Sequence, residues 1–373
     1  MAVNSNAKRK ICRENAYRDE GVTPPRGFSS TKSKTEPKPS LVMKPIIPFA
    51  LLGALLAVGT AQAASTTPVG YTTTPLTVGQ FSFVGLTVQH PTLSAGVLTA
   101  ESANSVTAGT TDFVALLGAP GSATYILELP DGTIQEVTTW TNTGVLTTPD
   151  DVTAAVTPNT TTYKLRKAAT ISDIFGATNS AGLKPDTDGD FLNNADLVTV
   201  LGAGGAQTTI YYYNDGSDQG WYTAGGADAA NIPVVYADGF YVKRQAGGGP
   251  LNLVVTGEVK TVATKGVLIN GYNFISSVAP AGLTLGTSGL QNFISPDTEG
   301  DYTGPTVDNV LLPQPNGSFV TAYYYNDGSP DAGWFTATGG DAANLPLEGT
   351  FLILNKGASK PYTLSVPNSY NSL

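Results

Sequence analysis

The stretch Tyr-Tyr-Tyr-Asn-Asp-Gly-Ser occurs twice in this chain, at Tyr211 to Ser217 and at Tyr323 to Ser329. Both copies continue into a Trp-aromatic-Thr-Ala run, at Trp221 to Ala224 and at Trp334 to Ala337. Both then reach Asp-Ala-Ala-Asn-x-Pro, at Asp228 to Pro233 and at Asp341 to Pro346. The spacing between copies stays between 111 and 113 residues, which predicts one structural unit that is used twice.

The residues around the repeat favour β-structure. Thr, Val, Tyr and Gly are frequent, while helix formers such as Lys, Glu and Met are scarce. Upstream, Thr124 to Leu129 and Thr133 to Val137 alternate in polarity around Pro130-Asp131-Gly132, which predicts a hairpin. We therefore expect an all-β fold of tandem β-sandwich or barrel-like units with an internal duplication.

The repeat also suggests where the units begin and end. We divide the chain into a disordered or upstream segment, a signal peptide, an N-terminal β region and two β repeats, at residues 1–42, 43–63, 64–165, 166–262 and 263–373. A fainter similarity links the segment that begins at Phe83 with the one that begins at Phe274. It suggests that the N-terminal region is a diverged or rearranged unit.

The segment from Met43 to Ala63 has the features of a secretory signal peptide. Lys44 is followed by a short apolar core and then by Ala61-Gln62-Ala63, a typical cleavage site. The apolar core is too short to span a bilayer comfortably, so we expect no transmembrane segment in the mature chain. We expect the protein to be secreted to the periplasm, the outer surface or the extracellular space.

Composition excludes several kinds of chemistry. From residue 64 onward the chain has ten Lys and Arg against 25 Asp and Glu, a net charge of −15 that repels nucleic acid. The one cysteine, Cys12, lies before the signal peptide, so disulfides and thiol catalysis are excluded. His90 is the one histidine of the chain, and its place before a proline makes a catalytic role improbable.

Two acidic segments are candidate calcium loops. The motif Pro-Asp-Thr-(Asp/Glu)-Gly-Asp places carboxylates at alternate positions, as Ca²⁺ sites often do. The spacing resembles the loops of EF-hand-like, dockerin and thrombospondin-type repeats, but the glycine expected at the sixth position is Phe191 here. The candidate ligands are Asp186, Asp188, Asp190 and Asp196 in copy one, and Asp297, Glu299, Asp301 and Asp308 in copy two. The alternative is a pair of solvated acidic turns.

Aromatic residues of the repeat are candidate ligand contacts. On a strand, Tyr211 and Tyr213 share one face and Tyr212 takes the other. The Trp of each copy lies across the Asn-Asp-Gly turn, within reach as a cross-strand partner. We name Tyr212, Trp221, Tyr324 and Trp334 as candidate glycan contacts. The alternative, which we favour, is that these side chains fill the core.

A resemblance supports export and architecture. The segments Pro68 to Tyr71, Gly239 to Arg244 and Leu253 to Lys260, with the Tyr-Tyr-Tyr-Asn and Gly-Trp elements, resemble an uncharacterised family of secreted bacterial β-repeat proteins. Copy two departs from this pattern, with Leu352 to Asn355 in place of the Tyr-Val-Lys-Arg of copy one. That family has no established activity, so the resemblance implies no site.

These observations favour a non-enzymatic structural or binding protein of the cell envelope or extracellular space. The partner would be an extracellular glycan or an envelope protein. A carbohydrate-binding module, with or without Ca²⁺, is the alternative. A glycoside hydrolase is the third candidate, because paired carboxylates can act without His or Cys.

The signal peptide makes a direct prediction. Sequencing the amino terminus of the exported protein should give Ala64 as the first residue, because signal peptidases cleave after the A-x-A motif. A mature terminus far upstream of Ala64 would contradict this interpretation.

Overall fold

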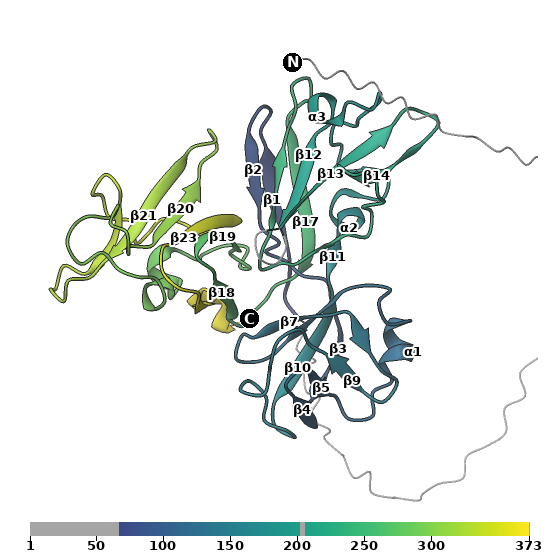
Figure 1. Ribbon diagram of the computed structural model, residues 1–373, viewed down its shortest axis with the longest axis horizontal. Helices are drawn as coiled ribbons and strands as arrows, with labels where there is room; N and C mark the ends of the chain where they lie inside the picture. The colour runs from purple at the N-terminus through teal and green to yellow at the C-terminus, as the bar shows by residue number, and fades with distance from the viewer. Residues whose placement is uncertain (1–66, 202–205, 373) are drawn as a thin grey trace, which may run out of the picture. The chain divides into compact units, whose positions relative to one another are not determined.

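The computed structural model describes residues 67–201 and 206–372, so the predicted signal peptide and the segment before it lie outside the described residues. The described chain consists of antiparallel strands with a few short helices, which confirms the all-β prediction (Figure 1). None of the helices in these residues is long and apolar enough to cross a membrane.

Two four-stranded antiparallel sheets form the N-terminal region. The first has the order β3 (Thr92–Val97), β10 (Thr162–Lys167), β6 (Tyr125–Glu128) and β7 (Ile134–Val137). The second has the order β4 (Ala100–Ser102), β5 (Ser105–Thr107), β9 (Val145–Thr147) and β8 (Thr139–Trp140). The two sheets and the short helix α1 (Phe113–Leu117) enclose one apolar core.

The hairpin predicted at Pro130-Asp131-Gly132 is confirmed. β6 and β7 pair in antiparallel register from Glu128–Ile134 to Tyr125–Val137. Gly132 has a φ of 96°, which a residue with a side chain rarely adopts. Asp131 closes the turn by accepting hydrogen bonds from the backbone N–H and the hydroxyl of Thr133.

A five-stranded sheet carries the first copy of the repeat. Its order is β14 (Gln219–Thr223), β13 (Gln207–Asn214), β12 (Leu197–Leu201), β16 (Phe240–Lys243) and β2 (Phe81–Val84). Two short ribbons accompany it, β1 (Val69–Leu76) with β17 (Leu251–Glu258) and β11 (Ala169–Thr170) with β15 (Pro233–Val234). Helices α2 (Ile171–Phe175) and α3 (Phe191–Asn194) complete this part.

A second five-stranded sheet carries the other copy. Its order is β22 (Gly333–Thr336), β21 (Phe319–Tyr325), β20 (Asn309–Pro313), β23 (Thr350–Asn355) and β19 (Gly271–Ser276). A ribbon of β18 (Thr264–Leu268) and β24 (Lys360–Leu364) accompanies it. The 3-10 turns are η2 (Leu285–Thr287), η3 (Leu290–Asn292) and η4 (Asn368–Ser372).

The two five-stranded sheets have the same strand order, and the repeated segments occupy corresponding strands. In the first sheet the edge strand β2 comes from residues 81–84, and the ribbon strand β1 comes from residues 69–76. The N-terminal sheets therefore interrupt the chain between β2 and the rest of its sheet. This differs from the predicted boundary at residue 166, and it places Phe83 and Phe274 on corresponding edge strands instead of in a separate unit.

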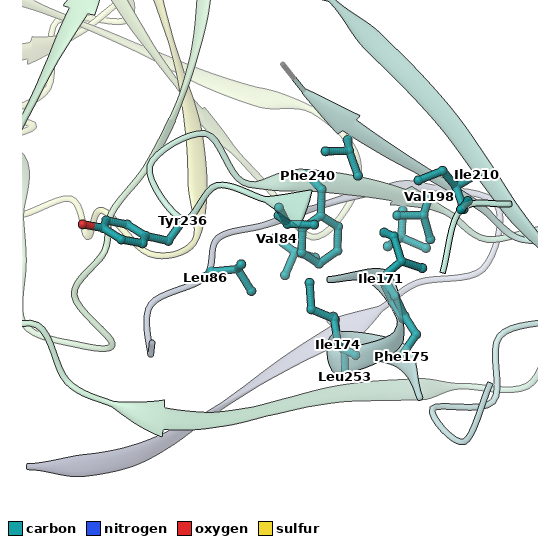
Figure 2. Close-up of a cluster of buried hydrophobic side chains, with 14 of the residues drawn as sticks. Val84, Leu86, Ile171, Ile174, Phe175, Val198, Ile210, Tyr236, Phe240 and Leu253 are labelled. Atoms are coloured by element: carbon teal, nitrogen blue, oxygen red, sulfur yellow. The ribbon is translucent and has the colours of Figure 1, made fainter. Parts of the chain in front are cut away.

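The core of the first sheet explains why these strands form. Val84, Val198, Ile210 and Phe240 belong to one cluster with the apolar side chains of α2 (Figure 2). Helix α2 begins at Thr170, whose hydroxyl accepts a hydrogen bond from the Asp173 N–H while the Asp173 carboxylate accepts one from the Thr170 N–H. This capping box fixes the direction in which α2 presents Ile171 and Phe175 to the sheet.

Buried charges join β10 and β6 to β17. The Arg166 guanidinium donates to the Glu128 carboxylate at 3.0 Å and pairs with the Glu258 carboxylate. The Tyr236 hydroxyl donates to the other Glu128 oxygen at 3.0 Å. Each buried charge thus has a partner, as burial away from water requires. The sequence gives no sign of this network, because its members are distant along the chain.

The three tryptophans offer a matched test of the cores. Trp221 Nε1 donates to the Gly176 carbonyl at 2.9 Å, and Trp140 Nε1 donates to the Gly118 carbonyl at 2.9 Å. Trp334 Nε1 is buried without a partner. We expect Trp221→Phe to lower the free energy of unfolding by about 1 kcal/mol more than Trp334→Phe, because only the first loses a hydrogen bond.

Urea unfolding of the purified chain measures the difference, with Trp140→Phe as the control that should behave like Trp221→Phe. Equal losses at Trp221 and Trp334, or a larger loss at Trp334, would contradict this account of the two cores.

Candidate functional site: two aromatic rows

Strand alternation separates the three tyrosines of each copy. Tyr212 points into the core of the first five-stranded sheet. There it pairs in register with Trp221, and the centres of the two rings are 5.0 Å apart. Tyr324 and Trp334 pair in the same way in the second sheet, with their rings 5.5 Å apart. Tyr212, Trp221 and Trp334 are buried, and Tyr324 packs partly buried against the second core. A ligand at the surface does not reach the three buried rings.

The opposite face of the first sheet carries a different set of aromatic rings. Phe191 of α3 stacks on Tyr211 of β13, with centroids 4.4 Å apart and planes 8° apart. Tyr222 of β14 follows at 6.4 Å from Tyr211 and at 6.4 Å from Tyr213. All four side chains are partly exposed. We call these four residues the first row.

The second sheet carries a matching set. Tyr302 stacks on Tyr323 of β21 with centroids 5.3 Å apart and planes 19° apart. Phe335 of β22 follows at 6.2 Å from Tyr323 and at 6.3 Å from Tyr325. These four residues, also partly exposed, form the second row. Both rows therefore have the same order of contacts.

At two of its four positions, each row keeps the aromatic ring but not the hydroxyl, whereas Tyr211 and Tyr213 correspond to Tyr323 and Tyr325. Phe191 corresponds to Tyr302, and Tyr222 corresponds to Phe335. The shared property at these positions is thus a flat apolar face with a negative π surface. A site that used the phenol as an acid, a base or an obligatory hydrogen-bond donor would need the hydroxyl in both copies.

The acidic loop holds each row in place. The Asp186 N–H donates to the Tyr212 carbonyl at 2.8 Å, and the Asn214 N–H donates to the Asp186 carbonyl at 2.8 Å. The Asp186 carboxylate is buried and accepts from the Gly189 N–H at 3.1 Å. These bonds tie the loop along β13 and so bring Phe191 against Tyr211.

The second loop repeats this arrangement with one difference. The Asp297 N–H donates to the Tyr324 carbonyl, and the Asn326 N–H donates to the Asp297 carbonyl, both at 2.8 Å. Asp297 Oδ1 accepts from the Gly300 N–H at 2.9 Å, but Oδ2 is buried without a partner. Burial first, and then the charge of Asp297, raise the pKa of the Tyr323 phenol. The pKa of the Tyr325 phenol is raised by its hydrogen bond to Asp327 first, then by burial and by nearby charges that include Asp297.

Most other candidate metal ligands are engaged within their loops. Asp188 accepts two hydrogen bonds from the Asn194 amide, and Asp190 accepts two from the Asn193 amide. Asp301 accepts from the Thr303 N–H and hydroxyl, while the Glu299 N–H donates to Asp297. Within residues 67–201 and 206–372, no three His, Cys, Asp or Glu side chains form a group that could hold a metal ion. Calcium binding stays a prediction.

Asp196 and Asp308 are buried and paired with cations of the chain itself. Asp196 accepts from the Lys184 and Gln245 N–H groups, both at 2.7 Å, and lies 2.9 Å from Arg244 Nε. Asp308 accepts from the Ser295 and Lys356 N–H groups, at 2.7 and 2.9 Å, and pairs with Lys360 at 2.5 Å.

The partner cation comes from a different place in each sheet. Arg244 directly follows β16, whereas Lys360 begins β24. In copy two the position of Arg244 is taken by Asn355, so the cation is supplied from another strand. Both carboxylates therefore serve the structure: each bonds two backbone N–H groups from separate segments and has its charge balanced.

Exposed carboxylates lie on the segments next to Tyr222 and Phe335. Asp218 accepts from the Tyr222 hydroxyl at 3.4 Å, and Asp228 pairs with Tyr222 through a β-bridge. Both carboxylates, after burial of the ring, raise the pKa of the Tyr222 phenol. In copy two Asp341 makes the same bridge with Phe335, and the exposed Asp331 lies in the turn before β22, where its charge helps to raise the pKa of Tyr325 after the hydrogen bond to Asp327 and burial.

Sequence reasoning missed these four carboxylates and the outward rings. The signal that could have found Asp228 and Asp341 was the offset of 113 residues that holds from Trp221 onward, whereas the offset changes from 112 to 113 at Asp218. The alternation of side chains along the Tyr-rich strands shows that Tyr211 and Tyr212 lie on opposite faces of the sheet, but it does not show which face packs against the core.

Comparison with protein families, curated proteins and solved structures found no match for this chain.

The buried ion pairs lead to a stability prediction. Arg244→Met and Lys360→Met should each lower the free energy of unfolding by about 3–5 kcal/mol, because each leaves a buried carboxylate without its cation. Lys265→Met is the control, since the pair of Lys265 with Asp131 is solvent-exposed and should be worth under about 1 kcal/mol. Chemical unfolding provides the measurement. Losses at Arg244 and Lys360 no larger than at Lys265 would refute the structural role of Asp196 and Asp308.

Proposed function

We propose that this is an exported, non-enzymatic binding protein of the cell envelope or extracellular space, and that the two aromatic rows are its binding surfaces. The observation that carries the proposal is the repetition of the same partly exposed row on both sheets. The core needs only the inward rings, Tyr212 and Trp221 and their counterparts. Core packing therefore does not account for the outward rings.

A glycan is the ligand class that the rows favour. Rings that lie side by side on an open sheet face offer flat apolar surfaces on which the carbon–hydrogen faces of sugars can stack. The carboxylates beside them can accept hydrogen bonds from sugar hydroxyls. This supports a carbohydrate-binding module as the finer form of the proposal.

Two rows on one chain also favour a polymeric ligand. A polymer that engages both rows turns the second contact into an intramolecular step, which raises the overall affinity without new contacts. Copies of a binding surface are useful in this way, whereas an enzyme usually needs one catalytic centre.

Binding to polysaccharides tests the proposal. The purified chain should co-sediment with insoluble cellulose or chitin, or bind chitosan, which dissolves once its amines are protonated. Tyr222→Ala and Phe335→Ala, each alone, should weaken binding, and the double variant should weaken it by at least about tenfold, because both rows then lack a central ring.

The control is Tyr71→Ala with Tyr272→Ala, two exposed tyrosines outside the rows, and this pair should bind like the unchanged chain. Failure to bind any of these polysaccharides would overturn a glycan function. Hydrolysis of a polysaccharide that is lost on changing one carboxylate would replace the proposal with a glycosidase.

A further inference from the structure

Negative charge surrounds both rows. In the first, Tyr213 donates to Asp215 at 3.1 Å and Tyr222 donates to Asp218 at 3.4 Å, while Asp186 lies behind Tyr211. In the second, the pKa of the Tyr325 phenol is raised by its hydrogen bond to Asp327 first, then by burial and by the charges of Asp297 and Asp331. Across the described residues, none of these carboxylates forms an ion pair with Lys or Arg.

This contrasts with the carboxylates that serve the fold. Asp196, Asp308, Glu128 and Glu258 are each paired with a cation of the chain. The exposed carboxylates around the rings have no such partner, and the buried carboxylates of Asp186 and Asp297 accept backbone N–H groups in place of a cation. A ligand that brings its own positive charge would complement the rows, through the carboxylates and through the π faces.

Asp218 and Asp228 are placed to receive that charge. Both are exposed, and beyond one hydrogen bond each, from the Tyr222 hydroxyl and the Ala230 N–H, their side chains have no partner in the described structure. Asp341 makes the same bridge with Phe335, and Asp331 is a second exposed carboxylate in the turn before β22. Each row therefore has two exposed carboxylates on the segments next to its third aromatic residue.

An extended peptide would need a free strand edge beside the row, and that edge is occupied. The Thr223 N–H donates to the Ala227 carbonyl at 2.8 Å, and the Ala229 N–H donates to the Trp221 carbonyl at 2.9 Å. The corresponding bonds of β22 are made from Thr336 to Gly340 and from Ala342 to Trp334. The chain's own loop thus covers the outer edges of β14 and β22, which disfavours strand addition.

We propose that the rows bind a glycan that carries protonated amino groups, with the sugar ring on Tyr222 or Phe335 and the ammonium group beside the flanking carboxylates, Asp218 and Asp228 or Asp331 and Asp341. This rests on the proposed function and narrows it to a class of glycan. A neutral polysaccharide would gain the stacking contact and hydrogen bonds from its hydroxyls, but no ion pair.

Chitosan and chitin separate the two contributions, because they share a backbone and differ in whether the amine is free or acetylated. At a pH where its amine is protonated, chitosan should bind at least about tenfold more tightly than chitin. Added salt should reduce this difference in affinity, because salt screens the attraction between exposed charges. Asp218→Asn with Asp331→Asn should reduce chitosan binding by about tenfold while leaving chitin binding unchanged.

Two controls distinguish a site from general attraction between an acidic protein and a polycation. Glu101→Gln with Glu348→Gln also removes two negative charges, but outside the rows, and should leave chitosan binding intact. Tyr222→Ala with Phe335→Ala removes no charge and should weaken the binding of both chitosan and chitin, because both lose the stacking contact. Thermal unfolding of every variant checks that the fold is retained.

Each contrary outcome has its own meaning. Equal binding of chitin and chitosan would overturn this inference and leave a glycan-binding function standing. Equal losses in the row and control variants would show unspecific charge attraction. Competition by poly-lysine as effective as by glucosamine oligomers would favour a basic peptide. Binding to no polysaccharide at all would overturn the proposed function itself.

Discussion

The two-residue period of β13 and β21 is the constraint on which the rest depends. Because successive side chains on a strand face opposite ways, burying Tyr212 against Trp221 requires Tyr211 and Tyr213 to face outward. A shift of one residue in register would expose the core ring and bury the other two. The Asn-Asp-Gly turn, in which Asn214 accepts from the Gly216 N–H, prevents such a shift. Core and candidate site are thus opposite faces of the same strand.

The acidic loops connect this constraint to the surface. The N–H and the carbonyl of Asp186 both bond to β13, which holds the loop along this strand. Phe191, five residues further along the loop, stacks on Tyr211. At the far end of each loop, Asp196 or Asp308 bonds two backbone N–H groups and needs a cation, which Arg244 provides in one sheet and Lys360 in the other. Both copies have the carboxylate at the same place in the loop, but its cation comes from different parts of the chain. This indicates that the fold requires the carboxylate, whereas the source of the cation can vary.

Local features were predictable from sequence, and long-range ones were not. The hairpin at Asp131-Gly132 and the alternation of Tyr211 to Tyr213 depend on residues a few positions apart, and both follow from composition and period. The pairing of β1 with β17 joins residues more than 170 positions apart, and no local pattern predicts it. For the same reason the interruption of the first sheet required the structure. The internal duplication, inferred from the repeated sequence, stays a prediction. The matching strand orders of the two five-stranded sheets agree with it.

Hydroxyl-radical footprinting of the purified chain, with and without glucosamine oligomers, tests the central claim most directly. The account predicts that the ligand protects the outward rings of both rows, above all Tyr222 and Phe335, and leaves Tyr71 and Tyr272 as reactive as before. Tyr212 and Trp221 should be unreactive with or without ligand, because they are buried. Ligand-dependent protection elsewhere with none at the rows, or strong reactivity of Tyr212 and Trp221 in the free chain, would contradict it.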